Sequence, residues 1–368
     1  MRKLGTSESL AVQLAKPLRY FPKQELDKLL KRIKEVGVES LLNEATRLRT
    51  HFFLLQNLDS DPLFKSLAGE YDETLNRWLD LRKYFHDKVF DLLKRYEKKV
   101  FCLKDFNIFS WTSSNYSKSR FSADFDFMPE EGLVEEMRSF FSDEGYVNGY
   151  VEYESLEFSH LDRDRKAEDL HYELMPLFQL IPIDETPLSG FDFSKLKRFR
   201  FPICRYREEL YTYIKIDIHA DVAQDLDANF VWSTFATKLK RLPHSNLFGF
   251  EPEDLIWYLS LKLYYESHNS NRFHHKKNFR YLIDIFLVIK SCDIQWGFLL
   301  SKIITLKISP ALYYTFEALD EIFNFRPNPS FMKSLKEEAL KPELRNLDLG
   351  CFMRKLFCLG LDDRLKLF

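Results

Sequence analysis

The sequence predicts an α+β fold, in which a small mixed sheet is flanked by N-terminal and C-terminal helical regions. Apolar residues recur at helical spacing from about residue 22 to residue 97. The pattern changes to the alternation typical of strands near residue 98 and returns to helical spacing beyond residue 228. The sequence therefore predicts a helical region, an α/β core and a helical domain, over residues 1–97, 98–228 and 229–368.

The composition is typical of a soluble globular protein with two or three subdomains. The chain has 368 residues, of which 45% are hydrophobic and 30% charged, and this length exceeds that of a single hydrophobic core. Its 54 basic and 56 acidic residues give a net charge of −2, so no overall field points to nucleic acid or to a membrane. The low count of 11 glycines argues against glycine-rich dinucleotide-binding loops.

Cysteine usage and hydropathy indicate the compartment. The five cysteines are scattered, and no two have the close spacing of a zinc knuckle or a redox motif, so we expect free thiols in a reducing compartment. No apolar segment follows the N-terminal charges, and the longest apolar runs are too short to span a bilayer. The sequence therefore predicts a cytoplasmic protein with no membrane partner.

Helices are predicted on both sides of the core. The N-terminal region is expected to contain one helix after Pro22 and another over about Leu75–Tyr96, each with apolar residues on one face and charged residues on the other. We expect these charged residues to form a solvated helix face rather than a binding patch. Three helices are predicted in the C-terminal region, over residues 252–265, 279–289 and 310–325.

The core is predicted to begin with a buried strand, Val100–Leu103, and to continue with a second strand around Asp124. A helix is expected to follow, with its start at Pro129 and its end at Gly145. The pair Asn148-Gly149, between short apolar and aromatic segments, predicts a β-hairpin. Further strands are predicted over residues 156–159, 170–174 and 211–219.

Two carboxylates stand one residue apart in the second strand. Asp124 and Asp126 are predicted to share one face of the strand, while Phe125 and Phe127 face the other way. Two neighbouring anions repel each other unless a cation lies between them, and Mg²⁺ binds through one or two carboxylates together with water and phosphate. The spacing alone is a weak signal, because it recurs at Asp59/Asp61, Asp162/Asp164 and Asp225/Asp227.

A later strand presents a third carboxylate. Ile214, Ile216 and Ile218 are expected to face the core, and the alternation places Asp217 on the opposite face, between Lys215 and His219. If the two strands are neighbours, three carboxylates suit two Mg²⁺ ions about 3.5–4 Å apart, as used in phosphoryl or nucleotidyl transfer. A solvent-facing polar strand edge explains the pattern equally well. Asp169, in the similar segment Asp169-Leu170-His171, is a rival third carboxylate.

Four motifs occur in order along the core: Leu103-Lys104, Arg120, Asp124-Phe125-Asp126-Phe127 and Asp217-Ile218-His219. This order resembles the nucleotidyltransferases of the DNA polymerase β superfamily, and especially a bacterial group of uncharacterised nucleotidyltransferase family proteins. In that group a Leu-Lys-Gly element leads to an Arg and an Asp-x-Asp, with Asp-Leu-His on a later strand. Glu251–Leu255 and Arg280–Asp284 resemble its helical C-terminal part, so the likeness covers about residues 75–290.

The resemblance implies a metal-dependent enzyme that transfers a nucleoside monophosphate from an NTP to an acceptor and releases pyrophosphate. It implies that Asp124 and Asp126 bind both metal ions, Mg²⁺ or Mn²⁺. Asp217 then binds the catalytic ion and activates the acceptor hydroxyl. The acceptor is left open between a small molecule, a peptide, a protein and an RNA end.

The resemblance also implies contacts to the triphosphate. Lys104 and Arg120 are candidates for phosphate contact. Lys215, close to the third carboxylate, is a further candidate for binding the nucleotide. One position departs from the family, because Asp105 stands where the family has glycine. Glycine there lets backbone N–H groups approach the triphosphate closely, whereas aspartate adds bulk and negative charge.

The sequence leaves alternatives open. Asp105 motivates a catalytically inactive nucleotidyltransferase fold that acts as a binding or regulatory module, and a third reading is a helical scaffold without nucleotide chemistry. A basic run interleaved with aromatic residues suits a triphosphate or single-stranded nucleic acid, or else a solvated strand face; its members are Lys195, Lys197, Arg198, Arg200, Arg205 and Arg207. A zinc site at His268, His274 and His275 lacks a fourth ligand, so an interhelical loop is expected there.

Overall fold

The computed structural model describes residues 14, 20, 23–47, 50–59, 61–112, 120, 122, 124–130, 132–152, 154–161, 176–219, 240–241, 247–268 and 279–341. Contacts between residues divide the chain into two compact units. The helical unit comprises Met1–Asp72, Trp111–Phe121 and Pro252–Phe368, and the sheet unit comprises Glu73–Ser110 and Ser122–Glu251.

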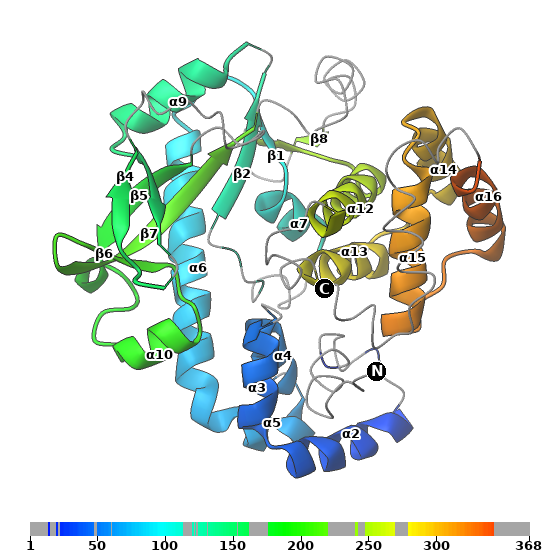
Figure 1. Ribbon diagram of the computed structural model, residues 1–368, viewed down its shortest axis with the longest axis horizontal. Coiled ribbons are helices and arrows are strands. Elements are labelled where there is room, and N and C mark those ends of the chain that lie inside the picture. Colours follow the sequence, from blue (N-terminus) through cyan, green and yellow to red (C-terminus); the bar gives the residue numbers. More distant parts are fainter. Residues whose placement is uncertain are drawn as a thin grey trace. The chain divides into compact units, whose positions relative to one another are not determined.

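Within the described residues, a mixed sheet of nine strands forms the centre of the sheet unit (Figure 1). The strands are β1 (Val100–Cys102), β2 (Asp124–Pro129), β3 (Val147–Val151), β4 (Phe158–His160), β5 (Leu177–Pro182), β6 (Ile203–Tyr206), β7 (Glu209–Ile218), β8 (Lys240–Arg241) and β9 (Leu247–Gly249). They lie in the order β4-β3-β5-β7-β2-β1-β9-β8, with β6 paired to β7. The pairs β2–β7 and β1–β9 are parallel. The predicted α+β fold with a mixed sheet is therefore confirmed.

Helices cover the aromatic face of β2. The helical elements of the sheet unit are α6 (Asp72–Leu93), α7 (Asp105–Trp111), α9 (Val134–Asp143), α10 (Phe193–Arg198) and the 3-10 turn η4 (Ile183–Glu185). The Phe125 ring packs against Phe106 of α7, and the Phe127 ring stacks on Phe141 of α9. Since side chains alternate along a strand, the carboxylates of β2 face away from this aromatic layer.

The predicted hairpin at Asn148-Gly149 is wrong, because β3 runs straight through both residues and pairs with β4 and β5. A Cβ atom at Gly149 would overlap the ring of Phe158 on β4. Glycine therefore serves the close approach of an aromatic ring at this position. The Asn-Gly signal does not distinguish this use from the positive φ that a tight turn requires.

Other predicted core elements are confirmed with shifted ends. β1 and β7 match the expected strands, and α9 ends just before Gly145, which has a φ of +86°. α9 begins at Val134 rather than at Pro129, because β2 extends as far as Pro129, which pairs with Val100. The strand expected over residues 170–174 lies outside the described residues.

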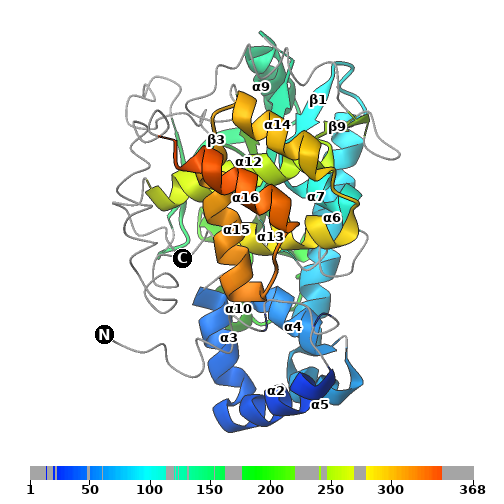
Figure 2. The ribbon, with the colours of Figure 1, turned by 90° about the vertical axis from the view of Figure 1, so that its right-hand side faces the viewer.

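The helical unit contains α2 (Lys23–Val36), α3 (Val38–Arg47), α4 (His51–Asp59), α5 (Pro62–Ala68), η2 (Gly69–Tyr71), α12 (Pro252–His268), α13 (Phe279–Ser291), α14 (Trp296–Thr305), α15 (Ser309–Phe323) and α16 (Pro329–Ala339). Figure 2 shows α14, α15 and α16 side by side, where the rings of Trp296, Phe316 and Phe331 pack against one another. The three helices predicted for the C-terminal region are confirmed as α12, α13 and α15.

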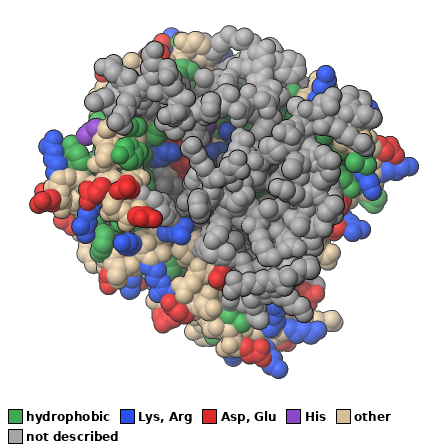
Figure 3. Space-filling model, viewed as in Figure 1, with side chains coloured by type: hydrophobic (Ala, Val, Ile, Leu, Met, Phe, Trp, Pro, Cys, Tyr) green, Lys and Arg blue, Asp and Glu red, His purple; other side chains and the backbone are tan. Residues whose placement is uncertain are grey.

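Two properties of the described residues bear on partners. None of the described helices is both long and apolar enough to cross a bilayer. On the face seen in Figure 3, the described Lys and Arg side chains are interspersed with Asp and Glu side chains. This mixture agrees with the net charge of −2.

Candidate functional site

The three predicted metal-binding carboxylates lie on two neighbouring strands. β2 and β7 are parallel, with Asp126 directly opposite Asp217 and Asp124 opposite Lys215. Residues opposite each other on adjacent strands project from the same face of a sheet, and residues two apart on one strand do so as well. Asp124, Asp126 and Asp217 therefore share the face that points away from the aromatic layer.

Asp126 is the most enclosed of the three carboxylates, with a side chain that is 2% exposed. Its Oδ1 atom accepts hydrogen bonds from Lys104 Nζ at 2.6 Å and from His219 Nε2 at 2.9 Å. The ends of the sheet strands place both donors: the backbone N–H of Leu103 donates to the Asp126 carbonyl, and that of His219 donates to the Phe127 carbonyl. Lys104 and His219 are thereby held on either side of β2.

The charge of Asp126 follows from these neighbours. Burial by itself raises the pKa of this carboxyl, but the Lys104 ammonium and the His219 ring outweigh it and hold the pKa well below its usual range. Asp126 is therefore ionised at neutral pH. Its Oδ2 atom is buried and has no hydrogen-bond partner among the described residues. A buried, ionised oxygen without a hydrogen-bond partner is strongly disfavoured. A cation bound at Asp126 Oδ2 would therefore be stabilised strongly.

This lowered pKa predicts a pH dependence of stability. Asp126 binds its proton readily only after unfolding, when its pKa returns to about 3.9, so the free energy of unfolding should fall as the pH drops below about 4. In Asp126→Asn this decline should be shallower. Urea unfolding at pH 3–6 measures it, with the exposed Asp184→Asn as the control that retains the steeper decline. Equal declines in the wild type and Asp126→Asn would contradict the assignment.

Asp217 has a cationic neighbour of its own. Lys215 Nζ donates to Asp217 Oδ2 at 2.7 Å, between two residues on the same face of β7. The side chain of Asp217 is 5% exposed, and that of Lys215 is 25% exposed. Lys104 and Lys215, both predicted to bind the nucleotide, thus each neutralise one of the site's carboxylates.

The donor set fits a divalent cation in chemical type. Carboxylate oxygens are the preferred ligands of Mg²⁺ and Mn²⁺. Asp126 Oδ2 is a carboxylate oxygen that has no hydrogen-bond partner among the described residues. As they stand, the described His, Cys, Asp and Glu side chains do not gather three to a common point. A metal ion held by all three carboxylates would therefore require some of these side chains to move.

Comparison with known proteins identifies the family. A family model described as "Uncharacterised nucleotidyltransferase" matches residues 22–324. The chain belongs to this nucleotidyltransferase family. The match confirms the resemblance drawn from the core motifs and extends beyond the predicted residues 75–290 at both ends. No curated protein and no solved structure matches the chain.

Arg120 belongs to the helical unit. Its Nε donates to both carboxylate oxygens of Asp284 on α13, at 3.0 and 2.9 Å, and both side chains are 0% exposed. The pair connects residues 164 positions apart, which no local pattern indicates. Contact between Arg120 and phosphate stays a prediction.

Asp105, which stands where the resemblance implies a glycine, is the first residue of α7. Its carboxylate accepts a hydrogen bond from Arg82 Nη2 at 2.9 Å, and the two side chains are 1% and 3% exposed respectively. A guanidinium therefore compensates the negative charge that aspartate introduces. The prediction of a solvated charged face is wrong for Arg82, because this residue of α6 is buried. The sequence carried no signal for its role.

The described residues do not include four of the other candidates, namely Asp169, His171, His274 and His275. The basic run is divided between α10, which carries Lys195, Lys197 and Arg198, and the β6–β7 hairpin, which carries Arg205 and Arg207. Lys195 approaches Glu73 at 3.4 Å. A role of this run in binding nucleic acid stays a prediction.

Proposed function

We propose that this protein is a metal-dependent nucleotidyltransferase, which transfers a nucleoside monophosphate from an NTP to a hydroxyl or phosphate group on an acceptor. The observation that carries the proposal is the register of β2 and β7, which sets Asp126 opposite Asp217 on the face shared with Asp124. Membership of the nucleotidyltransferase family supports the reaction class. The acceptor is one of the four classes named above.

The reaction makes specific demands on this face. The acceptor oxygen attacks the α-phosphorus, the bond from that phosphorus to the bridging oxygen of the β-phosphate breaks, and pyrophosphate leaves. Divalent cations, when bound, neutralise the phosphates and lower the pKa of an attacking hydroxyl. Asp124 and Asp126 orient the nucleotide, and Asp217 takes up the proton of a hydroxyl acceptor.

The lysines suit the same reaction. Lys104 and Lys215 are held by the carboxylates that are to bind the cation. Once those carboxylates bind a cation, the two ammonium groups are available to the triphosphate, where positive charge stabilises the leaving pyrophosphate. The compensated charge of Asp105 removes one source of repulsion against the nucleotide.

The competing proposal is an inactive nucleotidyltransferase fold that binds a partner or a nucleotide without turnover. Its support is the two lysine contacts, which neutralise Asp126 and Asp217 without any metal ion. This module differs from the enzyme in one measurable way, because it releases no pyrophosphate under any condition.

The test is a screen of α-labelled NTPs with the full chain, in Mg²⁺ or Mn²⁺, against small-molecule, peptide, protein and RNA fractions. We expect pyrophosphate release together with label in one acceptor fraction, and NTP binding by calorimetry that Asp124→Ala abolishes. Binding without pyrophosphate release in every fraction would favour the module. Absence of NTP binding by the wild type would overturn the enzyme proposal.

A further inference from the structure

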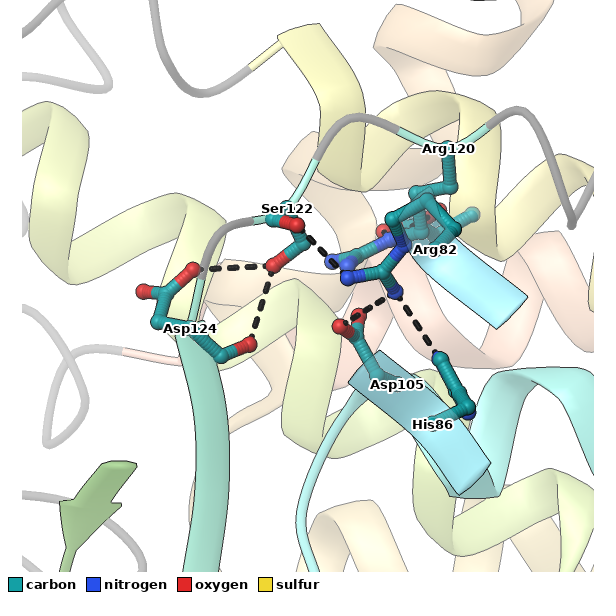
Figure 4. A network of polar contacts seen from close by, with 7 residues as sticks. Arg82, His86, Asp105, Arg120, Ser122 and Asp124 are labelled. Carbon is teal, nitrogen blue, oxygen red and sulfur yellow. Dashed lines mark hydrogen bonds and ion pairs between the residues drawn. The ribbon is translucent and has the colours of Figure 1, made fainter. Parts of the chain in front are cut away.

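Arg82 and Ser122 form a chain of hydrogen bonds that ends on Asp124 (Figure 4). Arg82 Nη1 donates to the backbone carbonyl of Ser122 at 2.6 Å. The Ser122 hydroxyl donates in turn to Asp124, at 2.8 Å from its carboxylate Oδ1 and 3.1 Å from its backbone carbonyl. The guanidinium thus holds the backbone of the residue whose side chain holds the carboxylate.

The guanidinium itself is fixed from several sides. Arg82 Nη2 donates to Asp105 Oδ2 at 2.9 Å and to His86 Nε2 at 3.0 Å. Its central carbon lies 5.5 Å from the centre of the Phe125 ring and 5.7 Å from that of Phe109. A planar fork held in this way aims Nη1 in one direction, whereas a lysine ammonium on a flexible stem is aimed far less well.

Asp124 has the greatest need of such support. It is the first residue of β2 and is half-buried, whereas Asp126 and Asp217 are buried deeper along their strands. A half-buried carboxylate at a strand end retains rotamer freedom, and ordering it on metal binding is unfavourable. The Ser122 hydroxyl restricts that freedom before any cation arrives.

We propose that Arg82 and Ser122 are positioning residues that hold Asp124 in the orientation needed for a divalent cation, and that Asp105 anchors Arg82. The aspartate at the family's glycine position thereby acquires a role within the site. This inference rests on the proposed function, because it takes Asp124 to be a metal ligand. Partners that orient metal ligands typically contribute about 10–100-fold in metal affinity.

The test measures Mn²⁺ binding to the nucleotide-free full chain by electron paramagnetic resonance, so the readout is independent of catalysis. Ser122→Ala and Arg82→Lys are each expected to raise the Kd for Mn²⁺ by about 10-fold. The double variant should have a Kd for Mn²⁺ close to that of the single variant with the higher Kd, because both changes break the same chain of hydrogen bonds. Arg77→Lys is the matched control: Arg77 lies on the same helix and also donates to a backbone carbonyl at 2.6 Å, that of Pro187. It should bind Mn²⁺ like the wild type.

Each other outcome has a definite meaning. Wild-type Kd values in Ser122→Ala and Arg82→Lys, with binding lost in Asp124→Asn, overturn the positioning role and leave the proposed metal site intact. Independent, multiplying effects overturn the connection between Arg82 and Ser122. Unchanged binding in Asp124→Asn overturns the proposed site and this inference with it. If Arg82→Lys fails to fold, Ser122→Ala decides, since it leaves the Arg82–Asp105 pair intact.

Discussion

Asp217→Asn is expected to slow nucleotide transfer by about 1,000-fold, which corresponds to about 4 kcal/mol of lost transition-state stabilisation. The amide is neutral, so it neither balances the charge of a divalent cation nor accepts the proton of an acceptor hydroxyl. The substitution preserves the shape of the side chain, and Lys215, 25% exposed, regains water in place of its partner. The sheet unit should therefore stay folded. Steady-state pyrophosphate release at saturating NTP and Mg²⁺ measures the effect.

Asp184→Asn provides the control for this change. Asp184 lies in the exposed turn η4 of the same unit, so the same chemical change there should leave the rate unchanged. If Asp217→Asn transferred nucleotides at the wild-type rate with an unchanged metal requirement, Asp217 would not belong to the catalytic group.

Arg120→Met is expected to lower the free energy of unfolding of the helical unit by about 3–5 kcal/mol. The substitution leaves the Asp284 carboxylate fully buried without the guanidinium that now contacts both of its oxygens. Removal of one partner from a buried pair is far more damaging than removal of both. The loss of unfolding free energy is measured by urea unfolding, with hydrogen exchange of the α13 amides as the readout.

Two further variants separate burial from charge. Arg326→Met removes a guanidinium whose Nε also contacts a carboxylate, that of Asp320 at 2.6 Å, but Arg326 is 80% exposed, so the loss should be below about 1 kcal/mol. The double variant Arg120→Met/Asp284→Leu should recover much of the lost stability. An Arg120→Met protein of unchanged stability but reduced NTP affinity would instead favour the predicted phosphate contact.

Local patterns predicted the strands of the site well. The alternation of Ile214, Ile216 and Ile218 is a property of a few consecutive residues, and their complete burial agrees with it. The same period of two assigned Asp217 to the opposite face. The helices of the C-terminal region were equally accessible, because their apolar spacing is also local.

Features that depend on distant partners were missed. The sequence around Gly149 predicts a turn, because the Phe158 ring that requires glycine there lies on another strand. The local pattern predicts a solvated Arg82, because Asp105 and Ser122, which bind it, are 23 and 40 positions away. In each case the residue type was compatible with both environments.

The sequence by itself determined the α+β class, the strand and helix periods and the likeness to the nucleotidyltransferase family. Only the tertiary structure decided that β2 and β7 are parallel neighbours, with Asp126 opposite Asp217. It also decided that Asp105 is neutralised by Arg82 and that Arg120 pairs with Asp284. The physical reason is range: periodicity is set by backbone geometry within a few residues, whereas strand order and buried charge pairs depend on which distant segments share one core.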